Sequence, residues 1–247
     1  MNRYALVTGA SSGIGKACAL ALLKEGWHVA LVGRREDALQ QTAAESGSAL
    51  ALPLAGDVSN EGDVLRIFER VQENFGRLDL LFNNAGISLP YTLPGDMMGE
   101  DWRRAVDVNL NGAFYCLSQA FKMMQHQSPR GGRIINNGSI SAHAPRPGSI
   151  AYTATKHAIS GLTRAANLDG RSHDIAVGQI DIGNVASDMT LKMAKGVHQA
   201  DGSIKPEARM DMSAVVDTFM TMVRLPLSAN ILFTTVMATQ MPYVGRG

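Results

Sequence analysis

The sequence is poor in cysteine, in excess charge of either sign and in long apolar runs. Its two cysteines, Cys18 and Cys116, lie in apolar segments, so we expect free thiols in a reducing compartment and no disulfide framework. The 23 basic and 22 acidic residues nearly cancel, which argues against a nucleic-acid or anionic-membrane partner. No apolar run reaches the roughly 20 residues that a membrane-spanning helix needs, and Thr8 and Gly9 interrupt the apolar start too early for a signal peptide. These absences predict a cytoplasmic protein.

Short apolar runs alternate along the chain with segments that suit helices. Most of the runs are continuous, which is typical of strands buried on both faces of a parallel sheet. The expected strands cover 4–7, 28–32, 51–54, 78–82, 133–135, 175–180 and 231–238, and the expected helices cover 14–25, 36–46, 61–75, 101–127 and 152–171. The alternation predicts an α/β fold: a doubly wound, Rossmann-type parallel sheet of about seven strands, flanked by helices on both faces. We expect one domain over 1–247. Segment 184–212 is then either a substrate lid, which we favour, or a solvated loop with a short amphipathic helix.

A glycine-rich turn follows the first expected strand, in VTGASSGIG. Gly9, Gly13 and Gly15 would let the backbone turn tightly and approach a phosphate, where helix N–H groups and the helix dipole favour negative charge. Their spacing is wider than the common G-x-G-x-x-G fingerprint. A plain strand-to-helix turn is the alternative, but the position at the start of an α/β chain favours dinucleotide binding.

Two arginines, Arg34 and Arg35, follow the second expected strand. An acidic residue there binds the ribose diol of NAD, whereas guanidinium groups suit the 2′-phosphate of NADP. Glu36 and Asp37 come next and fit the first turn of a helix, where the dipole favours acids. The alternative is two solvated arginines at a helix start. The pattern predicts NADP(H) as the preferred cofactor, with NAD(H) possible.

Further motifs make the pattern specific. They are TGASSGIG (8–15), GDVS (56–59), FNNAG (82–86), DVNLNG (107–112) and Tyr152-x-x-x-Lys156. In this order the set resembles the short-chain dehydrogenase/reductase family, in its single-domain branch of about this length, over residues 3 to about 190. The resemblance implies an oxidoreductase that transfers a hydride between a nicotinamide cofactor and a carbonyl/alcohol pair.

The resemblance also implies roles for single residues. The implied catalytic residues are Asn109, Ser139, Tyr152 and Lys156. The implied cofactor-binding residues are Thr8, Gly9, Ser11, Ser12, Gly13, Ile14, Gly15, Arg34, Arg35, Asp57, Val58, Asn83, Ala85, Gly86, Tyr152, Lys156, Gly183, Val185 and Ser187. Candidates for the substrate border are Ser141, His143 and Ser149. The histidines show no metal-ligand spacing, so no catalytic metal is expected.

Several of these residues have a plainer interpretation. Asp57 could cap a helix that begins near Asn60, and Asn83 could be a turn residue. Asn109 could be an ordinary polar residue inside a long helix, with Asn111 as a neighbouring competitor. His143 could be an exposed loop histidine.

The expected chemistry explains why these residue types occur together. A free phenol has a pKa of ~10, and an ammonium beside it favours the phenolate; Lys156, four residues after Tyr152, lies on the same helical face. Tyr152 would exchange a proton with the substrate oxygen, and Ser139 would polarise that oxygen. Ser141 competes for the polarising role, but the thirteen-residue spacing to Tyr152 is the one the family uses. By resemblance, Lys156 also holds the nicotinamide ribose, and Asn109 anchors a water that links Lys156 to solvent.

The chain departs from the family pattern after the sixth expected strand. Ile182 stands where proline is usual, Gly178 where asparagine is usual, and Ser187 where threonine is common. Losing a proline frees a φ angle, so we expect a looser turn there. The departure keeps a second function open, a cofactor-binding regulator or scaffold with little turnover. By resemblance the oligomer is a homotetramer or homodimer, with contacts from the last strand and from helices 101–127 and 152–171.

Overall fold

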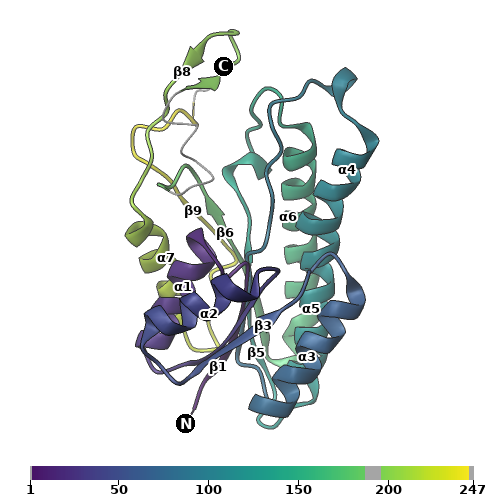
Figure 1. The fold of residues 1–247 in the computed structure, drawn as a ribbon, viewed down its shortest axis with the longest axis vertical. Helices are drawn as coiled ribbons and strands as arrows, with labels where there is room; N and C mark the ends of the chain where they lie inside the picture. Colours follow the sequence, from purple (N-terminus) through teal and green to yellow (C-terminus); the bar gives the residue numbers. More distant parts are fainter. Residues whose placement is uncertain (1, 187–195, 245–247) are drawn as a thin grey trace.

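A parallel sheet of seven strands, with helices on both faces, forms the body of the protein (Figure 1). The computed structural model describes residues 2–186 and 196–244. The strand order is β3-β2-β1-β4-β5-β6-β9, and every neighbouring pair is parallel. The strands are β1 Tyr4–Thr8, β2 His28–Gly33, β3 Ala51–Ala55, β4 Leu80–Asn83, β5 Gly132–Asn137, β6 Ile175–Ile182 and β9 Phe233–Val236. The predicted doubly wound sheet is confirmed.

The helices divide between the two faces of the sheet. One face carries α1 Gly13–Lys24, α2 Glu36–Ser46 and α7 Met212–Arg224, and the other carries α3 Glu61–Phe75, α5 Gly112–His126 and α6 Ile150–Gly170. The shorter elements are α4 Gly99–Val106, the 3₁₀ turns η1 Pro94–Asp96, η3 Ile140–Ala142 and η4 Arg171–His173, the π turn η2 Asp107–Asn111, and the hairpin β7 Val197–His198 with β8 Ile204–Lys205. Successive strand residues serve opposite faces: Ala5 and Val7 pack beneath α1 and α7, whereas Leu6 packs toward α3 and α5. Continuous apolar strands therefore fill two cores.

Two elements differ from the sequence-based expectation. The single helix expected over 101–127 is interrupted by the π turn at Asp107–Asn111. Helix α7 is not among the expected helices, although Val215, Phe219, Met222 and Val223 follow the i, i+4, i+7, i+8 spacing of a buried helical face. Of segment 184–212, the described part contains the β7–β8 hairpin and no amphipathic helix before Met212.

Arg133, a buried residue of β5, anchors the connection between α7 and β9. Its guanidinium donates to the carbonyl oxygens of Leu225, Pro226 and Ala229 and to Asn230 Oδ1, at 2.9–3.1 Å. Burial lowers the pKa of Arg133, and these four acceptors satisfy the charge. This contact fixes the last strand beside β6.

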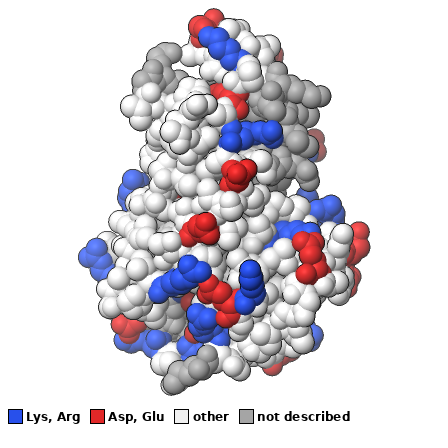
Figure 2. Space-filling model, turned by 90° about the vertical axis from the view of Figure 1, so that its left-hand side faces the viewer, with Lys and Arg blue, Asp and Glu red and all other residues white. Residues whose placement is uncertain are grey.

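The exposed surface carries charges of both signs. On the side of α1, α2 and α7, basic and acidic residues are mixed (Figure 2).

Both cysteines are buried and free, and burial raises the pKa of each thiol, for Cys116 to about 12. Across residues 2–186 and 196–244, no helix is long and apolar enough to cross a membrane. The same residues contain no group of three or more His, Cys, Asp or Glu side chains able to hold a metal.

The order of the strands places a crevice beside the glycine-rich turn. The chain winds outward from β1 through β2 to β3, and then returns to pair β4 on the other side of β1. Parallel sheets bind ligands at such a reversal, outside the carboxyl ends of the strands. The turns after β1, β2, β4, β5 and β6 therefore meet in one place.

Candidate active site

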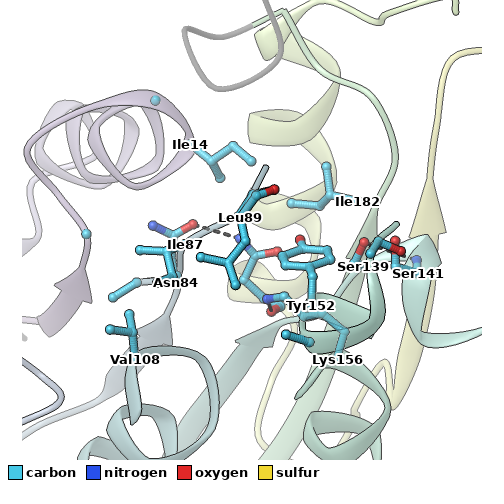
Figure 3. A pocket seen from close by; sticks show the side chains of 18 of the residues that line it. Ile14, Asn84, Ile87, Leu89, Val108, Ser139, Ser141, Tyr152, Lys156 and Ile182 are labelled. Atoms are coloured by element: carbon cyan, nitrogen blue, oxygen red, sulfur yellow. Dashed lines mark hydrogen bonds between the residues drawn. The ribbon is translucent and has the colours of Figure 1, made fainter. Parts of the chain in front are cut away.

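A cavity of about 680 Å³ opens at the carboxyl ends of the strands, and most of the residues predicted for the site line it (Figure 3). The predicted cofactor-binding residues in its wall are Gly9, Ser11, Ser12, Gly13, Ile14, Arg34, Arg35, Asp57, Val58, Ala85, Gly86, Gly183 and Val185. The predicted catalytic or substrate residues in its wall are Ser139, Ser141, Ser149, Tyr152 and Lys156. Segments far apart in the sequence thus share one cavity.

Two glycines of the turn after β1, Gly9 and Gly15, are packed too closely to carry a side chain. Gly9 has φ +67°, and a Cβ there would come within 2.9 Å of Asn84 Nδ2. A Cβ on Gly15 would come within 2.3 Å of the Gly9 carbonyl oxygen. The turn leads directly into α1, so its backbone N–H groups and the positive end of the helix dipole face the cavity. This cradle fits a dinucleotide phosphate.

Thr8 and Asn84 join the glycine-rich turn to the turn after β4. Thr8 Oγ1 accepts the N–H groups of Asn84 and Ala85, both at 2.9 Å, and Asn84 Nδ2 donates to the Thr8 carbonyl at 2.9 Å. Thr8 is fully buried and lies behind the cavity wall, whereas Asn84 lines it. Thr8 therefore holds the glycine-rich turn against the turn after β4 without lining the cavity itself.

The end of the cavity that the sequence predicts for the adenosine lies after β2 and β3. Arg34 and Arg35 are exposed at the rim, and Arg35 Nη2 donates to Ser11 Oγ at 3.4 Å. Glu36 and Asp37 occupy the first turn of α2, as the sequence predicts. Neither acid lines the cavity, whereas the two guanidinium groups and the carboxylate of Asp57 do.

Asp57 is not the cap of α3. The side chain of Asn60 caps that helix by accepting the Asp63 N–H at 3.1 Å. Asp57 Oδ1 instead accepts the N–H and hydroxyl of Ser59, at 3.0 and 2.8 Å, and the residue lines the cavity beside Val58. The capping alternative for Asp57 is therefore wrong.

Lys156 and Tyr152 stand on one face of α6. Lys156 Nζ lies 5.6 Å from the centroid of the Tyr152 ring and donates to the Asn137 carbonyl at 2.7 Å. Asn137 Nδ2 in turn donates to Asn84 Oδ1 at 2.8 Å. The lysine is 5% exposed, and the ring is half-buried in the cavity wall. The buried ammonium is thus held near the Tyr152 ring.

Ser139 follows β5 and presents its hydroxyl to the cavity. Its N–H donates to Asp181 Oδ1 at 3.0 Å, and its Oγ accepts the Ser141 N–H at 3.1 Å. Because the Oγ receives this N–H, its own proton remains available to a group in the cavity. Ser141 also lines the cavity, but its backbone is engaged in orienting Ser139.

Asn109 lies in the π turn between α4 and α5 and is 2% exposed. Its Oδ1 accepts the Ile87 N–H at 2.7 Å, and its Nδ2 donates to the Ile87 carbonyl at 3.0 Å and to Thr155 Oγ1 at 3.3 Å. The competitor Asn111 is turned away and bonds Asp107. Asn109 thus ties the turn after β4 to α6, behind the cavity wall.

Asn83 is buried and is not a turn residue. Its Nδ2 donates to the Ala113 carbonyl at 2.6 Å and to Asn136 Oδ1 at 3.3 Å. It belongs to β4 and joins that strand to α5 and β5. Gly15, Thr8, Asn83 and Asn109 therefore support the cavity without lining it.

Two further predicted residues, His143 and Ser187, are not found in the described cavity wall. His143 is 40% exposed and directs Nε2 to Asp181 Oδ2, at 2.9 Å, instead of lining the cavity. Ser187 lies outside the described residues. In the described part of the turn after β6, Ile182 pairs with Val236, and the Gly183 N–H donates to the Val236 carbonyl at 2.8 Å. Without the proline, β6 extends as far as Ile182.

The outer part of the cavity contains residues that the sequence does not single out. Tyr91 and His198 bring their ring centroids within 4.0 Å, and a Cβ on Gly148 would touch the Tyr91 ring. Arg146 donates to Asn184 Oδ1 at 2.7 Å and to Glu207 Oε2 at 2.5 Å. No local motif marks these residues, because their partners come from distant segments.

Comparison with known proteins gives consistent results. The family model described as short chain dehydrogenase matches residues 3–197. A relative named 3beta-hydroxysteroid dehydrogenase, from Mediterraneibacter gnavus, is 40% identical over 170 residues, which cover 68% of this chain and 60% of the relative. The solved structure of an actinorhodin polyketide ketoreductase variant with NADPH superposes with a TM-score of 0.87, at 26% identity, over 98% of each chain. The 3-ketoacyl-(acyl-carrier-protein) reductase from Brucella melitensis complexed with NADH has a TM-score of 0.85 at 24% identity, over 96% of this chain and 98% of that one, and shows the fold alone.

Proposed function

The chain belongs to the short-chain dehydrogenase/reductase family of oxidoreductases, and we propose that it transfers a hydride between NADP(H) and the carbonyl/alcohol pair of a small molecule. The observation that carries the proposal is the placement of Ser139, Tyr152 and Lys156 in one cavity that continues to the glycine-rich cradle at Gly9–Gly15. The cradle suits the cofactor's phosphates, and the hydroxyl, phenol and ammonium suit an oxygen that gains charge.

The roles of the side chains follow from their contacts. A nicotinamide bound in this cavity would supply the hydride in the reduction direction, and negative charge would then grow on the substrate oxygen. Ser139 donates its free hydroxyl proton to that oxygen in a hydrogen bond, and Tyr152 transfers the phenolic proton to it. Lys156 stabilises the phenolate that results, and two of its three N–H groups remain for the ribose hydroxyls of the cofactor. In alcohol oxidation the same groups act in reverse, with Tyr152 as the base.

The test of this function uses the whole protein with NADPH or NADH and a panel of ketones, aldehydes and 3-oxoacyl thioesters. We expect reduced nicotinamide to be consumed with at least one of these carbonyl classes, and the corresponding alcohol to return it with the oxidised cofactor. A protein that binds the cofactor but stays silent in both directions would support the alternative of a regulator or scaffold.

We propose NADP(H) as the preferred cofactor because Arg34 and Arg35 stand at the rim where the 2′-phosphate would lie. Arg34→Ala should weaken NADPH binding by about 10- to 100-fold, the value of a charge-assisted hydrogen bond of about 1.5–3 kcal/mol. NADH binding should change little, because NADH lacks the 2′-phosphate. Fluorescence titration of both cofactors measures the two effects.

A matched control for Arg34→Ala is Arg104→Ala. Arg104 is an exposed arginine on α4 that pairs with Asp101 and does not line the cavity. Its replacement should leave both dissociation constants unchanged. Equal weakening of NADPH and NADH by Arg34→Ala would show that Arg34 does not distinguish the two cofactors.

We also propose that the protein is cytoplasmic, that 1–247 acts as one domain, and that 184–212 covers the substrate. The contact between Arg146, in the cavity wall, and Glu207 supports the last point, because it joins this segment to the turn after β5.

A homotetramer is expected from the exposed apolar side chains Trp102, Phe114, Ile150 and Leu168 on α4, α5 and α6. Light scattering should give four times the chain mass; a monomer at micromolar concentration would contradict this.

A further inference from the structure

Asp181 is a buried carboxylate directly behind the cavity. It belongs to β6, and its side chain is 1% exposed. Oδ1 accepts the Ser139 N–H at 3.0 Å and the Gln179 side-chain amide at 2.7 Å, while Oδ2 lies 2.9 Å from His143 Nε2. A buried charge is tolerated only when hydrogen-bond donors surround it. A carboxylate can only accept, so His143 Nε2 donates.

Gln179 is itself held in place from α6. Its Nε2 also donates to Ser160 Oγ at 2.9 Å, and its Oε1 lies 2.9 Å from Thr163 Oγ1. Gln179 is fully buried, so its amide has no water to turn toward. The Gln179 amide therefore fixes Asp181 relative to α6, the helix that carries Tyr152 and Lys156.

The backbone at the end of β5 is shaped around this carboxylate. A Cβ on Gly138 would lie 2.0 Å from Asp181 Oδ1 and 2.5 Å from Gln179 Nε2. No side chain fits between the strand and the carboxylate at that position. The closeness brings the Ser139 N–H within reach of Asp181.

One carboxylate binds both ends of the turn that contains the serine. Ser139 is the N-terminal cap of the 3₁₀ turn Ile140–Ala142, and His143 is its C-terminal cap. Asp181 accepts the backbone N–H of the first and the ring N–H of the second. Among the residues that the structure describes, His143 is the one basic side chain within ion-pair distance of Asp181.

The negative charge of Asp181 also acts on the phenol of Tyr243, in the C-terminal segment. The pKa of the Tyr243 phenol is raised, first by burial and second by the negative charge of Asp181. Tyr243 packs beside Ile140 in the small apolar cluster that covers the serine turn. The turn is thus enclosed by β6, α6 and the C-terminal segment.

We propose that Asp181 is a positioning residue for the reaction: its carboxylate clamps the Ser139–His143 turn and aims the Ser139 hydroxyl at the substrate oxygen. The inference rests on the proposed function and deepens it. Asp181 does not line the cavity, so it acts through Ser139 and touches no reacting atom. The loss of kcat on removal of the Asp181 carboxylate should therefore not exceed the loss of kcat on removal of the Ser139 hydroxyl.

The experiment is a double-mutant cycle on kcat with Asp181→Ala and Ser139→Ala. Misplacing a reacting group by about 1 Å costs on the order of 10²-fold in rate, so Asp181→Ala should lower kcat by roughly 10- to 100-fold with cofactor affinity unchanged. In the Ser139→Ala background the same change should cost almost nothing, because residues that act as a unit are not additive. Additive losses would overturn the proposal.

Asp181→Asn is the conservative rescue. Its Oδ1 can still accept the N–H groups of Ser139 and Gln179, so kcat should return close to the wild-type value. If Asp181→Ala does not fold, His143→Ala replaces it in the cycle. This substitution removes the hydrogen bond between His143 and Asp181 Oδ2, and the His143 side chain is exposed. An effect of His143→Ala that persists at full size without the Ser139 hydroxyl would equally overturn the proposal.

The matched control is Asp79→Ala. Asp79 is a partly buried carboxylate that accepts the Tyr4 N–H at 2.9 Å and pairs with Arg77, at the opposite end of the sheet. Its loss should lower stability and leave kcat unchanged. If Asp79→Ala lowered kcat as much as Asp181→Ala does, the loss of kcat in Asp181→Ala would be due to general destabilisation of the protein.

Amide hydrogen exchange separates this proposal from the proposed function. Asp181→Ala should speed exchange at the Ser139 N–H, and Asp181→Asn should not. If the wild-type protein reduced no carbonyl but this exchange pattern held, the proposed function would fail while the clamp stood. Unchanged exchange in Asp181→Ala would remove the clamp, whatever the activity.

Discussion

Tyr152→Phe is expected to lower kcat by roughly 10²- to 10⁴-fold, the usual contribution of a positioned general acid or base. The ring keeps its place in the cavity wall and beside Lys156, because phenylalanine retains the shape of tyrosine without the hydroxyl. The reaction loses only its proton donor to the substrate oxygen. Steady-state rates in both directions, with cofactor dissociation constants measured separately, give the effect.

The control for this substitution is Tyr115→Phe. Tyr115 lies on α5, is partly buried against the core and does not line the cavity. It should keep wild-type rates, whereas Tyr152→Phe should keep only cofactor binding. A Tyr152→Phe protein with most of its turnover would show that another group moves the proton.

Ser139→Ala is expected to lower kcat by about 10²- to 10³-fold, as the loss of one donor to a developing oxyanion does. The Ser139 Oγ accepts the Ser141 N–H and so has its proton free for the substrate. The same change also removes the cap of a short turn, at about 1 kcal/mol of stability. Rates and thermal unfolding, measured together, separate the two losses.

Ser141→Ala distinguishes the two serines of the cavity wall. The sequence leaves both as candidates for the polarising hydroxyl, and both line the cavity. Because Ser141 orients Ser139 through its backbone N–H, removal of its side chain should cost far less than Ser139→Ala. A reversed order of the two losses would assign the polarising role to Ser141.

Much of the fold could be predicted because it follows from local pattern. Continuous apolar runs such as His28–Gly33 identify strands buried on both faces, and the glycine-rich turn has its position fixed between a strand and a helix. Their order along the chain then leaves few topologies. The motifs therefore had to meet at the carboxyl ends of the strands.

The rest depended on contacts between distant residues, which no local pattern encodes. Arg146 forms a hydrogen bond with Glu207, which lies 61 residues away in the sequence, and Asp181 with His143, which lies 38 residues away. The neighbours of His143 in sequence suggest the substrate border, but the carboxylate of Asp181 turns its ring away. The π turn that presents Asn109 likewise needs its partners, Ile87 and Thr155, to be seen.

The departure at Ile182 illustrates the same point. The missing proline suggests a loose turn, because the sequence shows the lost constraint and not its replacement. In the fold, pairing with Val236 and the approach of Met237 and Met241 to Gly183 hold the backbone. The backbone at Ile182 and Gly183 is therefore paired and packed without the proline.

The most direct test of hydride transfer is the fate of deuterium placed at both hydrogen positions on C4 of the reduced nicotinamide. With a carbonyl substrate in ordinary water, deuterium should appear on the carbinol carbon of the product, and solvent should supply only the hydroxyl proton. An alcohol whose carbinol carbon carries solvent hydrogen would contradict hydride transfer in this cavity.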